Sequence, residues 1–166
     1  MPAHDETVQP FLGALRQLAE GLAASGVLWA VTGSLGMVLQ GVPLKPHDVD
    51  VQTDAAGAYE IARRFAPNVV SPVCFSAAER IRSHFGALEL DGVPVEIMGD
   101  VEKRQPGEEA WEAVDLARHV RHVTVAGVGT IPVLELPYEV EAYRKLGRFE
   151  RADLVQHWLD TRQAGG

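Results

Sequence analysis

Residues 48–53, DVDVQT, set the tightest limit on how this chain can fold, because polar and apolar side chains alternate along them. A period of two is that of a β-strand. It places Asp48, Asp50 and Gln52 on one face and Val49 and Val51 on the other. The β-branched face favours burial, whereas carboxylates on a buried strand are costly unless something pairs with them. The pattern therefore predicts a half-buried strand whose acidic face has a specific partner.

A Gly-Ser pair, Gly33-Ser34, follows a β-rich run at 27–33, and a short helix is expected after it over 34–41. A strand that turns tightly into a helix presents free backbone N–H groups to an anion. Glycine lets the anion approach the backbone closely, and Ser34 adds a hydroxyl donor. The pair therefore predicts a phosphate-binding turn, with an ordinary strand-to-helix connection as the alternative.

The dipeptide Asp91-Gly92 lies between two alternating apolar runs and predicts a β-hairpin over 85–98. With these two residues in the turn, Glu96 lies opposite Ala87 on the face that points away from the apolar side chains. Glu96 is therefore the expected third acid, and Glu89 on the same face is the alternative.

Two same-face residues on one strand have Cα atoms about 6.5 Å apart. The carboxylates of Asp48 and Asp50 can therefore converge on one cation, or on two ions about 4 Å apart. Magnesium prefers a few carboxylates plus substrate phosphates to a complete protein cage, and Glu96 on a neighbouring strand would complete the set. The alternative is a solvent-exposed acidic strand face at a sheet edge.

The rest of the chain reads as alternating helices and strands. Helices are expected over 8–24, 55–65, 136–147 and 151–162, with Asp54 as the N-cap of the second. Two strands are expected over 117–127 and 129–134. Loops are expected around Pro67 and Pro72 and over 100–110. This order predicts an α+β fold, a mixed sheet packed by helices with a C-terminal helical segment. We expect one domain over 1–166, with a core at about 10–100 and an extension at about 111–166.

The net charge and the composition limit the kinds of partner and the compartment that we expect for this chain. The formal net charge of −8 argues against binding to long nucleic acid. Cys74 is the one cysteine, which fits a reducing compartment. The first ten residues lack the pattern of a signal peptide, and no run of about 18 apolar residues suggests a membrane span. The expectation is a cytoplasmic protein that does not enter membranes.

Taken together, Gly33-Ser34, the aspartates Asp48 and Asp50, and the later Glu96 resemble the pattern of the nucleotidyltransferase superfamily typified by DNA polymerase beta. The resemblance covers about residues 10–100. Within the superfamily the chain looks most like lincosamide nucleotidyltransferases and AbiEii-type toxin nucleotidyltransferases. It implies two Mg²⁺ ions held by the three acids and a nucleoside triphosphate whose leaving phosphates lie on Gly33 and Ser34.

The resemblance also implies the reaction. A nucleoside monophosphate, with AMP expected, moves from the triphosphate to a hydroxyl of a small molecule, a tRNA end or a protein, and pyrophosphate is released. Glu96 would hold the catalytic metal and help to take the hydroxyl proton. The net charge of −8 argues mildly against tRNA as the acceptor.

Several basic residues are candidates for nucleotide binding. The segment 141–155, EAYRKLGRFERADLV, is similar to a motif that ends many of these proteins, with Lys145, Arg148 and Asp153 at the matching positions. Lys45 and His47 precede the aspartates where the family often has arginine.

Arg82 and His84, just before the hairpin, either contact triphosphate or acceptor or form a solvated strand start. His47 beside Asp48 also fits an HD-type phosphohydrolase, but that motif needs a helix, and DVDV is strand-like.

A second hypothesis from another class is a non-catalytic nucleotidyltransferase-like module that binds nucleotide, protein or toxin. Its partner would be an antitoxin or a second copy of the chain. The joint presence of Asp48, Asp50 and Glu96 favours the enzyme.

Overall fold

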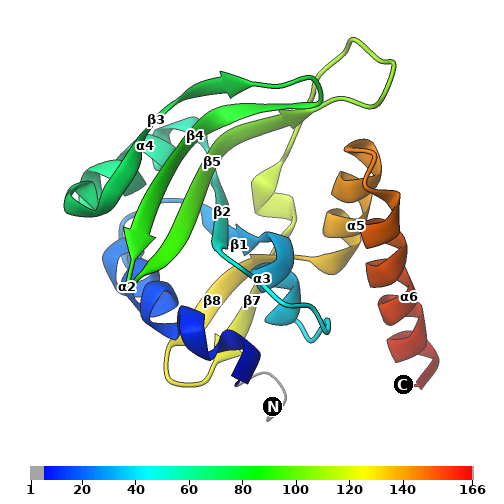
Figure 1. Ribbon diagram of the computed structural model, residues 1–166, viewed down its shortest axis with the longest axis horizontal. Helices are drawn as coiled ribbons and strands as arrows, with labels where there is room; N and C mark the ends of the chain where they lie inside the picture. Colours follow the sequence, from blue (N-terminus) through cyan, green and yellow to red (C-terminus); the bar gives the residue numbers. More distant parts are fainter. Residues whose placement is uncertain (1–5, 166) are drawn as a thin grey trace.

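A mixed eight-stranded β-sheet forms the centre of the computed structural model, which describes residues 6–165 (Figure 1). The strand order is β3-β4-β5-β2-β1-β8-β7, and β6 pairs with β5. The pairs β2/β5 and β1/β8 are parallel, and the other pairs are antiparallel. The strands are β1 (Trp29–Thr32), β2 (Val49–Thr53), β3 (Val69–Ala77), β4 (Ile81–Leu90), β5 (Val93–Lys103), β6 (Glu112–Ala113), β7 (Val120–Val125) and β8 (Gly129–Leu134). The predicted α+β fold with a mixed sheet is confirmed.

Helices form in each segment where the sequence predicts one, with bounds that differ by a few residues, although Leu154, expected on the apolar face of the last helix, is exposed. The α-helices are α2 (Leu12–Leu22), α3 (Gly33–Val38), α4 (Ala55–Arg64), α5 (Leu136–Lys145) and α6 (Phe149–Gly165). Single 3-10 turns are η1 (Gln9–Phe11), η2 (Ala66–Asn68) and η3 (Leu116–Arg118). Asp54 caps α4 as predicted, because its Oδ1 accepts a hydrogen bond from the Gly57 amide at 2.6 Å.

The hairpin register predicted from Asp91-Gly92 is confirmed. Both turn residues have positive φ, 52° for Asp91 and 75° for Gly92, as two-residue hairpin turns of type I′ require. Ala87 then lies opposite Glu96 in the β4/β5 ladder. This register fixes which face of β5 carries Glu96, and a slip by one residue would reverse it.

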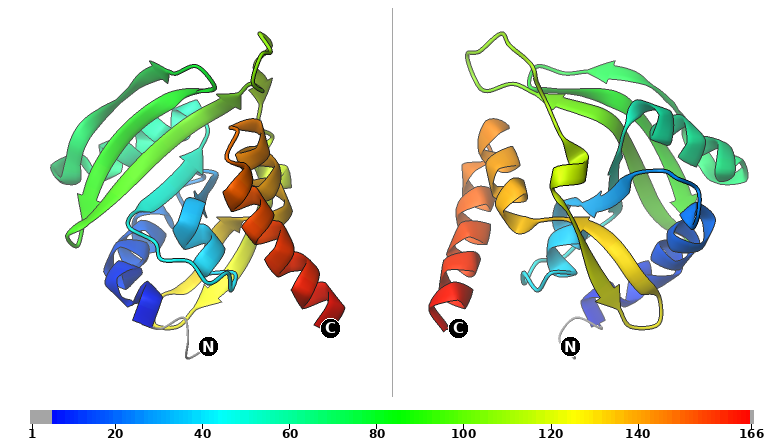
Figure 2. Two further views of the ribbon diagram at one scale, coloured as in Figure 1. Left: turned by 45° about the vertical axis from the view of Figure 1, so that its right-hand side comes forward. Right: turned by 180° about the vertical axis from the view of Figure 1, so that it is seen from behind.

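One apolar cluster joins the sheet to α2 and α4. Leu15 and Leu18 of α2, Ile61 of α4 and Val51 of β2 are fully buried within it. A second cluster, built around Met37, Val42, Leu136, Val140, Ala152 and Val155, joins α3 to α5 and α6. Figure 2 shows α5 and α6 side by side, with the end of β5 close to α5. The C-terminal helices therefore pack against the short helix that follows Gly33.

Two of the expected loops contain strand. The prolines Pro67 and Pro72 predict a loop, but Val69–Ala77 is strand β3 at one edge of the sheet. Its pairing with β4 is irregular between Ser71 and Cys74. Proline is tolerated there because an edge strand can leave an N–H position unpaired and a bulge can absorb the irregularity. The expected loop over 100–110 begins as strand, because β5 runs to Lys103.

Membrane insertion of a helix finds no support in residues 6–165, where each helix is too short or too polar to span a bilayer.

Candidate active site

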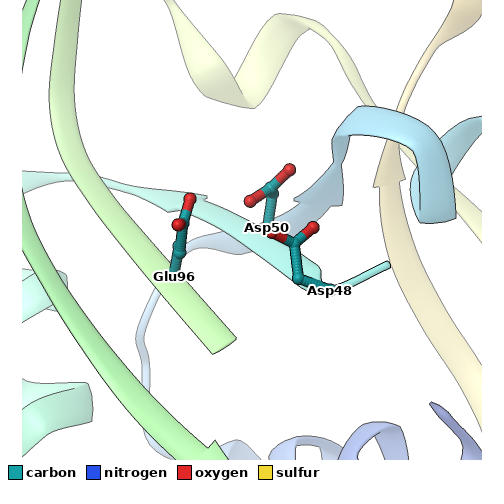
Figure 3. Close-up of side chains that lie close together, drawn as sticks. All are labelled: Asp48, Asp50 and Glu96. Atoms are coloured by element: carbon teal, nitrogen blue, oxygen red, sulfur yellow. The ribbon is translucent and has the colours of Figure 1, made fainter. Parts of the chain in front are cut away.

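Three carboxylates from two neighbouring strands meet near the middle of the sheet (Figure 3). Asp48 immediately precedes β2, Asp50 lies within it, and Glu96 lies on β5. One oxygen atom from each of the three side chains lies within 4.8 Å of the others, and all three residues are half-buried. The acidic residues that the sequence singles out are therefore brought together at spacing suited to a cation.

Local pairing explains this convergence. Val49 and Val51 are fully buried, so Asp48 and Asp50 must point to the opposite face of β2. The parallel ladder places Asp50 directly beside Glu96. Glu89, the alternative third acid, lies on β4 opposite Pro94 of β5, so that β5 separates it from β2, and it is exposed.

Burial and the neighbouring carboxylates both affect the pKa of Asp50. Burial raises the pKa of Asp50 to about 8, with further contributions from the negative charges of Asp48 and Glu96 and from a hydrogen bond with Glu96. A bound cation would remove this penalty, because it replaces repulsion with attraction. Carboxylate oxygens are the ligands that magnesium and other hard divalent cations prefer, so the residues present fit such a metal.

The Gly33 turn packs directly against the acidic cluster. Gly33 has φ of +71°, a conformation that favours glycine, and a Cβ at this position would clash with Asp50 Oδ2. Thr32, the preceding residue, pairs with Asp50 across the β1/β2 ladder. Glycine at position 33 therefore allows the turn and the carboxylate to lie in contact.

A buried glutamate on α5 holds this turn. Glu139 is 4% exposed, and its Oε1 accepts a hydrogen bond from the Thr32 hydroxyl at 2.5 Å. Its Oε2 accepts one from the Gly33 amide at 3.0 Å. Burial raises the pKa of Glu139 to about 7, although both hydrogen bonds and the charge of Lys103 oppose the shift. The Gly33 N–H is therefore bonded to Glu139, whereas the sequence pattern indicated a free amide at the turn.

An arginine on α6 reaches the other side of the turn. Arg151 Nη1 donates to Ser34 Oγ at 3.1 Å. Tyr143 on α5 is close enough to the site to be affected by its charges. Burial raises the pKa of Tyr143 to about 12; the negative charges of Glu139 and Asp50 add to this shift, and the positive charges of Arg148 and Arg151 oppose it. The guanidinium of Arg148 lies 5.1 Å from the Tyr143 ring centroid. Arg151 thus contacts the turn, and Arg148, which lies between α5 and α6, is close to Tyr143.

Three other predicted nucleotide-binding residues lie in the loop before β2 or at the end of α5. Lys45 and His47 are exposed in the loop that leads into β2. Lys145 Nζ lies 2.7 Å from Glu112 Oε2, beside a small cavity of about 100 Å³ that is also lined by Lys103 and His119.

Arg82 contacts β5 and Trp111, and His84 contacts Tyr59 of α4. Arg82 forms two hydrogen bonds with the Glu102 carboxylate, each 3.1 Å long, and its guanidinium lies 4.4 Å from the Trp111 ring centroid. His84 Nδ1 lies 2.9 Å from the Tyr59 hydroxyl. The structure brings neither of these side chains into contact with the Gly33 turn.

Sequence reasoning missed Glu139 and Arg151. A signal for Glu139 was present, because it lies three residues after Leu136 and four before Tyr143, on the apolar face of α5. An acid on that face indicates a buried partner. For Arg151 the pattern gave no signal, since an arginine on a C-terminal helix is ordinarily solvated.

Comparison with known proteins gives this arrangement its class. TM1012 from Thermotoga maritima, a provisionally assigned nucleotidyltransferase, has 49% sequence identity, a TM-score of 0.79, and coverage of 92% of this chain and 94% of its own. The lincosamide antibiotic adenylyltransferase LnuA, bound to lincomycin, has 12% identity, a TM-score of 0.51, and coverage of 83% and 93%. ANT(2'')-Ia in complex with adenylyl-2''-tobramycin has 9% identity, a TM-score of 0.53, and coverage of 92% and 98%. The chain is a nucleotidyltransferase.

Its family is defined more narrowly by sequence. The chain belongs to the aminoglycoside-2''-adenylyltransferase family, whose sequence profile matches residues 14–157. That match includes the acidic cluster, the Gly33 turn and most of the C-terminal helices. The two remote adenylyltransferases share the fold with this chain. No protein among those with curated descriptions matches it significantly.

Proposed function

We propose that this enzyme transfers a nucleoside monophosphate, AMP, from a nucleoside triphosphate to a hydroxyl group in a magnesium-dependent reaction. The observation that carries the proposal is the convergence of Asp48, Asp50 and Glu96 within 4.8 Å, against a turn that also contacts Arg151. Three acids gathered at the centre of a sheet need a cation to offset their repulsion. A polyphosphate substrate is itself strongly negative, so it can approach the three carboxylates only if the cation and Arg151 offset the repulsion between them.

Asp48, Asp50 and Glu96 are the residues that would hold magnesium, as two ions. Bound there, magnesium would neutralise the triphosphate and stabilise the charge that develops on the attacking and leaving oxygens. The chain's own task is to fix the carboxylates, which it does through the buried valines of β2 and the parallel pairing with β5.

Ser34 and Arg151 would bind the phosphates that leave. Because Arg151 donates to Ser34 Oγ, the hydroxyl hydrogen of Ser34 is free to point outward and donate to a phosphate oxygen. Arg151 and Arg148 supply positive charge locally in a chain whose net charge is −8. Charge-assisted contacts between arginine and phosphate are among the stronger hydrogen bonds in proteins.

The proposed step is a substitution at the α-phosphorus. The acceptor oxygen forms a bond to that phosphorus, and the bond to the oxygen that bridges the α- and β-phosphates breaks. The electron pair leaves with pyrophosphate, and Glu96 accepts the proton of the acceptor hydroxyl. Holding both reactants in line accounts for much of the rate enhancement in such reactions.

A small molecule with hydroxyl groups is the acceptor class that we favour. LnuA is bound to lincomycin and ANT(2'')-Ia to adenylyl-2''-tobramycin, and the family is described by an aminoglycoside reaction. The net charge of −8 disfavours tRNA and suits a cationic small molecule. The reducing compartment suggested by the single cysteine is consistent with a reaction in the cytoplasm.

The test is transfer of label from each α-³²P nucleoside triphosphate, with magnesium and a panel of hydroxyl-bearing antibiotics, to an acceptor. We expect labelled acceptor and pyrophosphate with the wild-type chain, most strongly with ATP. Asp48→Asn combined with Asp50→Asn should abolish transfer, and Glu96→Gln should reduce it at least about 100-fold. The matched control is Glu89→Gln, an exposed acid on the same hairpin, which should retain wild-type activity.

Transfer that persists in the Asp48→Asn, Asp50→Asn double variant would refute a metal-centred mechanism. A wild-type chain that binds nucleoside triphosphate but transfers label from none of those tested would instead indicate a non-catalytic binding module.

A further inference from the structure

Glu139 is a buried acid that the proposed reaction does not use. It comes from α5, more than one hundred residues after the turn that it contacts, and both of its carboxylate oxygens accept hydrogen bonds from that turn. One bond is from the Thr32 side chain and the other is from the Gly33 backbone. These two contacts fix the position and the tilt of the turn relative to α5.

The turn also limits where Asp50 can lie. A Cβ on Gly33 would clash with Asp50 Oδ2, so the backbone of the turn forms one wall of the space that holds the carboxylate. The same turn carries Ser34, whose hydroxyl contacts Arg151. A displacement of the turn would therefore move Ser34 and open space beside Asp50 at the same time.

The energetics of Glu139 suggest more than a structural anchor. Lys103 is 5% exposed, donates to the Tyr138 hydroxyl at 2.8 Å, and acts on Glu139 through its charge. Buried charges of this kind usually stabilise a fold no better than apolar residues of the same size. If α5 needed only to pack on β1, a leucine at position 139 would serve. Two directed hydrogen bonds to Thr32 and Gly33 are what the glutamate adds.

We propose that Glu139 is a positioning residue, which holds the Thr32–Gly33–Ser34 turn against Asp50 and acts on nucleotidyl transfer only through that turn. This inference rests on the proposed function, because its effect is measured on nucleotide binding and transfer. It also assigns a role to α5, which becomes the element that sets the geometry of a site built mainly from β-strands.

Three variants test the proposal, with Glu141→Gln as the matched control on an exposed face of the same helix. In Glu139→Gln the amide oxygen can still accept from the Gly33 N–H while its NH₂ group donates to Thr32 Oγ. We expect this variant to retain kcat and the KM for nucleotide within about threefold of wild type. Glu139→Leu removes both contacts at similar volume, and we expect kcat to fall at least about tenfold and the nucleotide Kd to rise. Thr32→Val removes one of the two contacts, so we expect its kcat to lie between those of Glu139→Gln and Glu139→Leu.

Thermal unfolding is measured for each variant, and kinetics are compared at a temperature where all of them are folded. A purely structural role predicts a lower Tm for Glu139→Leu with unchanged kcat and KM, and that result would overturn the proposal. If Glu139→Leu does not fold, Thr32→Val decides: wild-type kinetics in that folded variant would overturn it equally. A wild-type chain that transfers no nucleotide contradicts the proposed function, whereas an active wild type with equally active Glu139→Leu contradicts the role of Glu139 alone.

Discussion

Asp50 carries the largest electrostatic cost of the acidic cluster. Its pKa is about 8 in the folded protein against an ordinary 3.8, so the folded state binds a proton between these pH values that the unfolded state has lost. Stability therefore falls as pH rises from about 4 to 8. A cation bound at the cluster would recover this loss.

Asp50→Asn should stabilise the protein in buffer that contains EDTA, because it removes a buried charge and its repulsion with Asp48 and Glu96. We expect a gain of roughly 1 to 3 kcal/mol at pH 8 that shrinks towards zero near pH 4. Urea unfolding of both proteins at pH 5, 6.5 and 8 measures it, with the exposed Asp100→Asn as control. If Asp50→Asn is no more stable than wild type at pH 8, the charge of Asp50 does not destabilise the metal-free protein as we infer.

Gly33 is required by its backbone angle and by its contact with Asp50. Gly33→Ala should destabilise the protein by about 1 to 3 kcal/mol. It should also reduce transfer on the order of 100-fold, because the turn and the carboxylate must separate. Gly107→Ala is the control, since Gly107 also has positive φ, +82°, but its Cβ would meet nothing within 4 Å. Equal effects of both substitutions on transfer would show that backbone strain, and not the contact with Asp50, is responsible.

At the scale of elements, α6 matters because it delivers Arg151 to the turn. Arg151→Gln removes the charge that faces Ser34, and we expect the KM for nucleotide to rise about tenfold. Arg162→Gln, on the same helix with its guanidinium over the Trp158 ring, is the control and should leave KM unchanged. Steady-state kinetics with varied nucleotide measure both. An unchanged KM in Arg151→Gln would remove this arginine from the proposed phosphate site.

The elements that sequence reasoning recovered are those defined by local patterns. The β-turn at Asp91-Gly92 sets the hairpin register, and alternation along β2 sets its faces, so the faces that carry Glu96 and Asp50 follow from short-range patterns. The parallel pairing of β2 with β5, which places these two residues side by side, is a long-range contact that such patterns do not determine. Strand β3 was missed because Pro72 ordinarily argues against a strand, whereas an irregular edge strand accommodates it.

At the scale of the whole molecule, the site joins distant parts of the chain. Glu139 lies 106 residues from Gly33, and Arg151 lies 117 residues from Ser34. Contacts of this separation depend on how α5 and α6 pack on α3, through the Met37 and Val155 cluster, and no local pattern encodes that packing. Strand periodicity and one hairpin predicted the strand faces of Asp48, Asp50 and Glu96, and the resemblance to nucleotidyltransferases predicted that the three acids meet. The contacts of Glu139 and Arg151 with the turn were not predictable from the sequence.

Asp48, Asp50 and Glu96 are expected to bind divalent cations together, beside a triphosphate on the Gly33 turn, and the proposed function depends on this above all. Its most direct test is a crystal of the wild-type chain with Mn²⁺ and a non-hydrolysable ATP analogue, studied by anomalous diffraction. We predict anomalous density between the three carboxylates, with the triphosphate beside Ser34 and Arg151. Manganese bound elsewhere, or a triphosphate bound away from Ser34 with the three carboxylates free of metal, would contradict it.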